Sequence, residues 1–454
     1  LLITLLLATS TCPAIATVIT VNGNGKAEYT TIQAAIDAAA DSGDEIIVEA
    51  GIYTGTGDSV IDLQGKTFLL RSSAGPEETI IDGENTRAGI VCINPPGGTQ
   101  CRATVEGFTI RNGQGVDRSP DDGTPNRSGG AIELIYASPT ITNCVFWNNR
   151  ADRGGGLYCE SGNPTIENCT FEGNAAIGLF GGGMVLFNSS ATARGCLFRN
   201  NTAPRGGGIY SEGGRPMLID CTITANRAEV GSGGGFRCLS STPRMSACTF
   251  SGNSTSRFGG GLYSNNSNLI CNGCIFTGNN ANWGAGWAEH NSSAVLTGCE
   301  FRNNTANFNG GGYFNDRNPA RGLNGPTMED CTFEGNQAGW NGGGILAFFA
   351  AVNLTACTFS ENSAGQTGGG VSSFNAPANC NECIFTGNNA SLGGGWYDID
   401  SSQGNGPQNN TRITGCEFQE NVARSRGGGF YCLSETGTSK PVLGNCSFSN
   451  NRAV

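Results

Sequence analysis

The sequence predicts an all-β fold, a single-stranded right-handed parallel β-helix of about 15–17 coils with a short N-terminal capping helix. A Cys-x-Phe-x-x-Asn motif recurs twelve times, with Ile in place of Phe once, mostly at intervals of 25–27 residues. Eleven of the motifs are followed by Gly-Gly-Gly, or once by Gly284-Ala285-Gly286. Glycine makes up 72 of the 454 residues without a Gly-X-Y period, which excludes collagen.

The N-terminal residues are typical of export. Leu1–Ala8 is an apolar run, and Ala14-Ile15-Ala16 matches a signal-peptidase cleavage pattern. We therefore expect a partial signal peptide over residues 1–16 and a secreted or cell-surface protein, with a short hydrophobic strand as the alternative. Cys12 lacks a convincing lipobox, so no lipid anchor is expected. No later run of 18 apolar residues exists, so no transmembrane helix is predicted.

The charge narrows the range of partners. The formal net charge is −11, and the lysines are only Lys26, Lys66 and Lys440. An acidic chain with few lysines argues against binding to nucleic acid or to anionic lipid.

Residues 17–454 are expected to form one β-helix domain. "YTTIQAAIDAAADSGDEIIVEAGIY" predicts a capping helix over Thr31–Ala40 and a first strand at Ile46–Val48. Coils in residues 17–128 are irregular, with a loop at 115–128, and the regular repeats fill 129–454. The last repeat is cut short, so we expect a truncated C-terminus.

Each regular repeat is interpreted as three short strands. Cys and Phe are two residues apart, so they share one face of a strand, and an apolar residue lies three positions before Cys. Because three is odd, both can point inward only if the chain bends between them. Gly, Asn or Asp precedes Cys in nine of twelve repeats, which favours a one-residue left-handed corner. The cysteines are Cys144, Cys169, Cys196, Cys221, Cys248, Cys274, Cys299, Cys331, Cys357, Cys383, Cys416 and Cys446.

The third strand follows the glycines. Its first and third residues are expected inside, and its second residue, often Tyr or Phe, outside. Stacking the coils about 4.8 Å apart then turns each position of the repeat into a ladder. A Phe ladder fills the core, and the Asn ladder bonds backbone groups and the amides of its neighbours.

Two resemblances arise from these residues. "YTTIQAAIDAA…GDEIIVEAGIYTG" resembles the start of pectin-lyase-like β-helix proteins. "GGAI" at Gly129–Ile132 and the [F/I]-x-x-N motifs are similar to the repeats of polymorphic outer-membrane proteins. Together they cover nearly the whole chain after residue 16 and imply a right-handed β-helix. They do not imply one activity, because this fold hosts lyases, hydrolases, epimerases, adhesins and scaffolds.

Most cysteines are expected to be packing residues. In-register cysteines on neighbouring coils are too far apart and too parallel for disulfides. Cys92 and Cys101, which flank "INPPGGTQ", are the best disulfide candidates. Cys271/Cys274 and Cys380/Cys383 have C-x-x-C spacing, but Cys271 and Cys380 occupy the apolar core position. We therefore predict no metal site and no cofactor there, with redox chemistry or zinc as the alternative.

Catalytic signatures of enzymes with this fold are sparse. The paired aspartates, G-H-G and R-I-K of polygalacturonase-like enzymes are missing as a set, and Asp121-Asp122 lie in a loop. Alignment of third strands places Asn265, His290 and Asp316 in one column, with Glu289 and Arg317 beside it. Glu289, His290, Asp316 and Arg317 are thus candidates for general acid/base chemistry on a sugar. The alternative is an ordinary solvated polar face.

An aromatic stripe is the second candidate site. Phe258, Trp283, Phe308 and Trp340 occur just before the glycines on four consecutive coils. Together with the outward Tyr column they would offer a stacking surface for glycans or a partner, with packing between coils as the alternative.

The uniform coils favour an exported, non-enzymatic adhesin-like or scaffold protein whose partner is a polysaccharide or a cell-surface protein. A polysaccharide lyase or glycoside hydrolase is the alternative.

Overall fold

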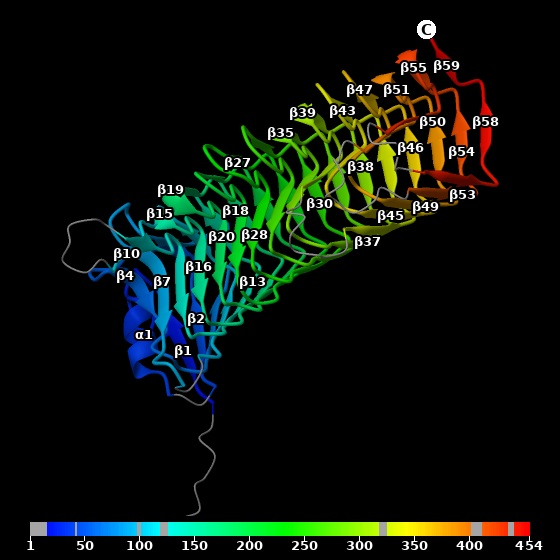
Figure 1. Ribbon diagram of the computed structural model, residues 1–454. Helices are drawn as coiled ribbons and strands as arrows, with labels where there is room; N and C mark the ends of the chain where they lie inside the picture. The colour runs from blue at the N-terminus through cyan, green and yellow to red at the C-terminus, as the bar shows by residue number, and fades with distance from the viewer. Residues whose placement is uncertain are drawn as a thin grey trace, which may run out of the picture.

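The computed structural model describes residues 16–40, 43–97, 101–118, 126–316, 325–400, 411–434 and 440–454. In these residues the chain winds into one long solenoid whose coils follow each other in sequence order (Figure 1). Four sheets run along it, with 16, 15, 14 and 14 strands among the described residues. The predicted parallel β-helix of about 15 coils is confirmed.

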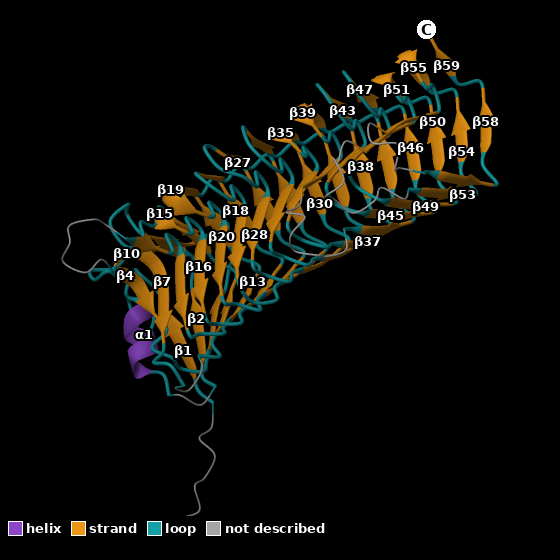
Figure 2. Ribbon diagram, viewed as in Figure 1, coloured by secondary structure: helices purple, strands orange, loops and turns teal. Residues whose placement is uncertain are grey.

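Each regular coil has four strands rather than the three that were expected. One coil consists of β13 (Thr140–Thr142), β14 (Val145–Trp147), β15 (Arg150–Arg153) and β16 (Leu157–Glu160). We name the sheets that contain them A, B, D and C, respectively (Figure 2).

Sheet D was missed because its inward residue is small. An alanine lies two residues after the ladder Asn in eleven of twelve repeats. Ala151, Ala203 and Ala281 are examples, and all three are buried. The recurring alanine was the available signal for this strand. It is a weak signal, because alanine is only slightly more hydrophobic than the residues beside it.

The corners are single left-handed residues, as predicted. The residue before each ladder cysteine has φ between +51° and +63° in all twelve repeats. This includes Ala247, Ala356 and Glu382, which are not residue types that favour this conformation. The fold therefore imposes the corner even where the local sequence does not prefer it.

The phenylalanines form the expected ladder in the core. Nine consecutive pairs, from Phe146–Phe171 to Phe418–Phe448, stack with centroids 4.3–4.9 Å apart and ring planes within 2–12°. The row is interrupted at Ile223, which pairs with Phe198 on one side and Phe250 on the other. Each ring contributes about 1.5–3 kcal/mol of burial.

The asparagines form a second ladder at the corner between sheets B and D. Asn253 shows the pattern. Its Nδ2 donates to Oδ1 of Asn279 at 3.1 Å and to the carbonyl of Ile223 at 2.8 Å, and its backbone N–H donates to the same Oδ1 at 3.0 Å. The same bonds recur from Asn149 to Asn451. The ladder thus satisfies buried polar groups that the corner would otherwise leave unpaired.

The N-terminal cap differs in detail from the prediction. Helix α1 (Ile32–Ala38) begins after the N-cap Thr31, whose Oγ1 accepts the N–H of Ala34 at 3.2 Å, and it contacts the first strands. The first strand is not at Ile46 but is β1 (Val18–Val21), which pairs in parallel with β2 (Glu45–Val48). The solenoid therefore begins before the helix.

The stretch at 115–128, which is predicted to be a loop, forms two short strands at its ends. β10 (Val116–Asp117) and β11 (Arg127–Ser128) pair antiparallel and begin sheet D. Asp121 and Asp122 lie outside the described residues, as does nearly all of the predicted signal peptide.

Candidate functional site

The predicted polar column is formed on sheet C. β32 (Leu262–Asn265), β36 (Trp287–His290) and β40 (Tyr313–Asp316) are neighbours in the sheet, and Asn265, His290 and Asp316 are in register. His290 Nδ1 lies 3.4 Å from Asp316 Oδ2, and these side chains are 38% and 32% exposed. A half-exposed imidazole oriented by a carboxylate can accept or donate a proton.

Glu289 does not join this pair, because it points into the solenoid. It is 1% exposed, and its carboxylate accepts hydrogen bonds from the Tyr313 hydroxyl, from Asn315 Nδ2 at 3.1 Å and from the Ala294 N–H at 2.9 Å. Burial, followed by the charge of Glu289, raises the pKa of Tyr313. Adjacent strand residues face opposite sides, so the sequence neighbour of His290 is excluded from its surface. Arg317 lies outside the described residues.

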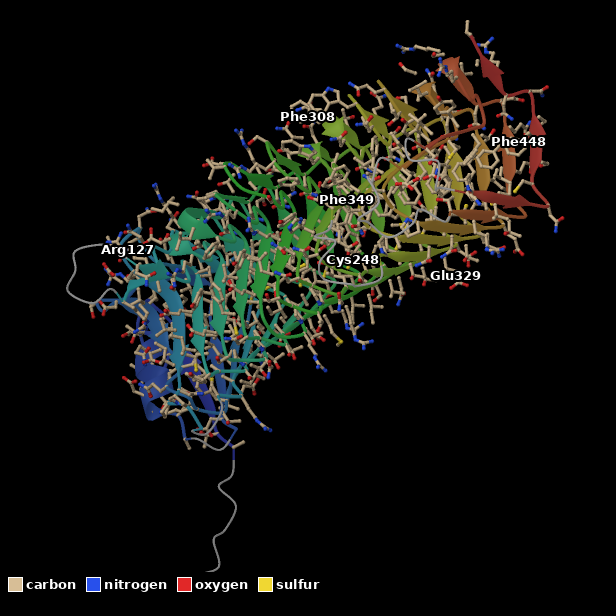
Figure 3. The ribbon with its side chains drawn as sticks, in the orientation of Figure 1. Arg127, Cys248, Phe308, Glu329, Phe349 and Phe448 are labelled. Atoms are coloured by element: carbon tan, nitrogen blue, oxygen red, sulfur yellow. The ribbon has the colours of Figure 1, made fainter. Side chains whose placement is uncertain are left out.

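The aromatic stripe is a continuous row of rings. Phe258 and Trp283 stack at 4.8 Å between centroids, Trp283 and Phe308 are 5.0 Å apart, and Phe308 and Trp340 are 4.5 Å apart. The first three side chains are half-buried, whereas Trp340 is 45% exposed. Figure 3 shows Phe308 at the outer rim of the coils, far from the core residue Cys248.

The sequence predicts that the outward Tyr column of sheet C belongs to an exposed stacking surface. The structure shows that this column is buried. Tyr263 is 8% exposed and Phe314 is 7% exposed, and both belong to a buried apolar cluster against which Phe258 and Trp283 pack. The stripe thus covers a second hydrophobic layer outside the solenoid. Phe258 and Trp283 thus pack against other coils, whereas Trp340 faces solvent, and binding by the stripe stays a prediction.

Polar side chains lie next to the stripe. Asn307 Nδ2 donates to Asn282 Oδ1 at 2.7 Å, and Asn282 Nδ2 donates to the Ser256 carbonyl at 2.6 Å. Asn307 is exposed and immediately precedes Phe308. The stripe therefore combines a row of stacked aromatic rings with two adjacent amides.

Sequence analysis missed an earlier aromatic group on the same side. Phe180 stacks on Tyr210 at 4.3 Å and meets Phe187 at 6.1 Å. Phe180 precedes Gly181 just as Phe258 precedes Gly259, so position in the repeat was the available signal. The two groups are separated by two coils, which have Arg205 and Ser232 at the same position.

The ladder cysteines are free thiols, as expected, and eleven of the twelve are at most 1% exposed. Their sulfurs donate to backbone carbonyls, for example Cys196 Sγ to the Ile166 carbonyl at 3.4 Å. Cys92 and Cys101 are both buried, and hydrogen bonding with Cys101 raises the pKa of the Cys92 thiol. The two side chains thus interact, and their disulfide stays a prediction.

One buried ion pair lies outside both candidate sites. Arg118 Nη2 contacts Glu133 Oε2 at 2.7 Å, and the Glu133 side chain is fully buried on β12 (Ile132–Ile135). Burial raises the pKa of Glu133, and Arg118 counteracts this shift. Because Arg118 directly follows β10, the pair joins the beginning of sheet D to sheet C.

Among the described residues, no helix is both long and apolar enough to cross a membrane.

The sequence of the chain matches the family described as right handed beta helix region over residues 49–216 and 181–319. Residues 330–347 match the Chlamydia polymorphic membrane protein repeat. No curated protein matches the sequence.

The solved structures that are similar to this chain have low sequence identity to it. The catalytic unit of a GH87 α-1,3-glucanase from Streptomyces thermodiastaticus is 13% identical, with a TM-score of 0.36, over 92% of this chain and 65% of that one. Bacteriophage CBA120 tailspike protein 3 is 12% identical, with a TM-score of 0.38, over 89% and 56%. The A-module of the mannuronan C-5 epimerase AlgE4 of Azotobacter vinelandii is 14% identical, with a TM-score of 0.31, over 92% and 91%.

This chain spans less than two thirds of the length of the first two of these structures. At such identities and TM-scores none of the three carries an argument about activity. The family match is different, because its two segments together cover residues 49–319, more than half of the sequence. Together with the four parallel sheets, it shows that the chain belongs to the right-handed β-helix family.

Proposed function

We propose that this protein is an exported, non-enzymatic β-helix that acts at the cell surface or outside the cell as an adhesin-like or scaffold protein, and that it binds a glycan along the aromatic stripe. The observation that carries the proposal is the row of four rings spaced 4.5–5.0 Å apart on consecutive coils. The apolar faces of sugar rings stack on aromatic rings, and neighbouring amides bond their hydroxyl groups. Asn282 and Asn307 supply such amides.

The test measures retention of the protein on a panel of insoluble polysaccharides. Trp283→Ala and Trp340→Ala are expected to weaken retention about tenfold or more, because a stacked anchor residue contributes roughly 2 kcal/mol. The matched control is Trp147→Ala on β14, whose side chain is 44% exposed, close to the 45% of Trp340, but lies on sheet B. Unchanged retention of both stripe variants on a polysaccharide that holds the native protein would contradict the proposal.

Export is supported by the apolar residues before position 17 and by the match to a membrane-protein repeat. Expression with a complete leader and sequencing of the exported protein's N-terminus tests it. A mature chain beginning at Thr17 is expected, and a chain that stays in the cytoplasm would contradict export.

A polysaccharide-cleaving enzyme is the second candidate. The His290–Asp316 pair favours an enzyme, because an imidazole beside a carboxylate can transfer a proton to or from a sugar. The pair lies on sheet C, near the buried layer under the stripe. Its test is the release of new reducing or unsaturated ends from soluble polysaccharides. If the native protein cleaves a polysaccharide and His290→Ala does not, the protein is an enzyme and the non-enzymatic proposal is wrong. If no polysaccharide of the panel gains new ends, the protein does not cleave these substrates.

A further inference from the structure

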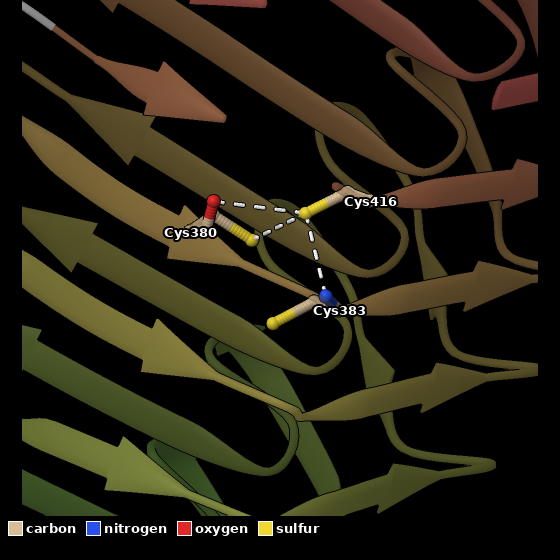
Figure 4. A group of neighbouring side chains, drawn as sticks. All are labelled: Cys380, Cys383 and Cys416. Carbon is tan, nitrogen blue, oxygen red and sulfur yellow. Dashed lines mark hydrogen bonds between the residues drawn. The ribbon is translucent and has the colours of Figure 1, made fainter. Parts of the chain in front are cut away.

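Three buried sulfurs meet at one corner of the solenoid. Cys380 lies on β49 (Ala378–Asn381), Cys383 follows the left-handed corner at Glu382, and Cys416 precedes β54 (Glu417–Gln419) on the next coil. The three Sγ atoms all lie within 4.8 Å of one another, and the residues are 2%, 0% and 1% exposed. The sulfurs of Cys380 and Cys416 are 3.5 Å apart (Figure 4).

The repeat explains why a third sulfur lies at this corner. Each ladder cysteine contacts a residue of the preceding coil, namely the one three positions before that coil's own ladder cysteine. Cys416 Sγ thus lies 3.6 Å from the carbonyl oxygen of Cys380, three positions before Cys383. That position is usually apolar, for example Leu354 and Ile413 on the adjacent coils. A cysteine there places a thiol beside two ladder thiols without any change of backbone.

Two of these sulfurs also accept backbone hydrogen bonds. The N–H of Cys383 donates to Cys416 Sγ at 3.4 Å, and the N–H of Cys357 donates to Cys383 Sγ at 3.3 Å. Donors directed at sulfur favour the thiolate, which is the form that binds a metal.

We propose that Cys380, Cys383 and Cys416 form a three-sulfur site for one soft monovalent cation, of which Cu(I) is the type. A metal–sulfur bond of about 2.3 Å places three sulfurs of a trigonal site about 4 Å apart, which matches the observed spread. Structural zinc takes four ligands, whereas three thiolates, with no carboxylate or imidazole ligand beside them among the described residues, suit a softer ion. The ion replaces thiol protons, which leave to solvent.

Among the described residues, this is the trio of potential metal ligands that gathers within 4.8 Å. Cys271 and Cys274 have the same C-x-x-C spacing as Cys380 and Cys383, and Cys299 is the ladder cysteine of the next coil, as Cys416 is. The sulfurs of Cys271 and Cys299 are 3.7 Å apart, but the three sulfurs do not all gather within 4.8 Å. They provide an internal control of equal chemistry and looser geometry.

The experiment loads the reduced full chain with an acetonitrile-stabilised Cu(I) salt without oxygen, both by incubation and by refolding, and then counts the copper that resists a chromophoric chelator. We expect one copper ion per chain to resist the chelator in the native protein and in Cys271→Ile. We expect no such copper ion in Cys380→Ile, which restores the apolar residue usual at this position. X-ray absorption is expected to show three sulfur ligands and no lighter ligand.

Several results would overturn the proposal. They are no retained copper by either route, equal copper in native and Cys380→Ile chains, or equal loss in Cys271→Ile. A Cys380–Cys416 disulfide in protein isolated with thiols blocked would also overturn it, because the sulfurs would then be used up. The Cys380→Ile chain must keep the circular dichroism of the native protein, and Cys380→Ser is the second variant if it does not.

Discussion

Asn253 donates a hydrogen bond from Nδ2 to Oδ1 of Asn279, one coil further along, at 3.1 Å. Both side chains are buried, at 0% and 1% exposure. The bond joins coils through side chains, in parallel with the backbone bonds of the sheets. Asn suits this position because its short side chain carries both a donor and an acceptor.

Asn279→Ala is therefore expected to destabilise the coils around it strongly. The change leaves the backbone N–H of Asn253 without its partner, and it removes one of the two acceptors of Asn253 Nδ2 and one donor to the carbonyl of Phe250. An unpaired buried group costs about 1–3 kcal/mol and each lost hydrogen bond about 1 kcal/mol, so the unfolding free energy should fall by roughly 3 kcal/mol. Urea unfolding followed by circular dichroism measures it. Asn280→Ala, at the exposed neighbouring position, should change it by less than about 0.5 kcal/mol.

The glycines should divide into two classes. At Gly298, φ is +58° and an added Cβ meets nothing within 4 Å, so Gly298→Ala should cost only the left-handed backbone, about 1 kcal/mol. At Gly286 an added Cβ would lie 2.4 Å from the Gly312 carbonyl oxygen and 2.9 Å from the Phe301 ring. Gly286→Ala should cost several times more, or prevent folding. If the two variants had equal thermal stability, the coils would have moved apart to accommodate the added methyl group, and the prediction would be wrong.

Two tryptophans of the stripe should differ in their effect on stability. Trp283 packs on the layer of Tyr263 and Phe314, so Trp283→Ala should lower the unfolding free energy by about 2 kcal/mol. Trp340 is 45% exposed, and Trp340→Ala should lower it by less than about 1 kcal/mol. Parallel urea titrations test this. If Trp340→Ala proved as costly as Trp283→Ala, its use as a binding variant would be compromised.

Acid should loosen the N-terminal cap through Asp44. Its carboxylate accepts the N–H groups of Thr17 at 2.8 Å and Ala40 at 2.7 Å, and these backbone hydrogen bonds hold the pKa of Asp44 below 3.8. A lowered folded-state pKa contributes stability that is present above pH 3.8 and is lost as pH falls through the folded value.

Hydrogen exchange of β1 and α1 between pH 5 and 2.5 should therefore accelerate relative to intrinsic rates as pH falls. Asp44→Asn should exchange faster already at pH 5 and show a weaker pH dependence. Glu77→Gln, at an exposed position, is the control and should follow the native protein. A native-like pH profile in Asp44→Asn would assign the effect to another group.

Much of the fold could be predicted because one physical demand repeats in every coil. The left-handed corner before Cys, the Phe ladder and the Asn ladder each need particular residue types at fixed intervals. Sheet D was missed because Ala281 and its equivalents give little contrast with their neighbours.

The site was harder to predict. The register of His290 with Asp316 followed from the repeat, but the opposite directions of Glu289 and His290 followed only from strand alternation, which had not been applied to this pair. The three-sulfur corner depends on contacts between coils, where Cys416 meets the residue three places before Cys383. Spacing within one coil cannot reveal such a contact.

Ile223 has a mechanical consequence. The coils are connected in series, so tension applied along the axis is carried in full by every interface between neighbouring coils. Failure then begins at the weakest interface rather than at random. The row of stacked rings is broken only where Ile223 stands between Phe198 and Phe250 in the column. A pull along the axis would therefore open the solenoid first beside Ile223, and Ile223→Phe should raise the force at which the first coils separate.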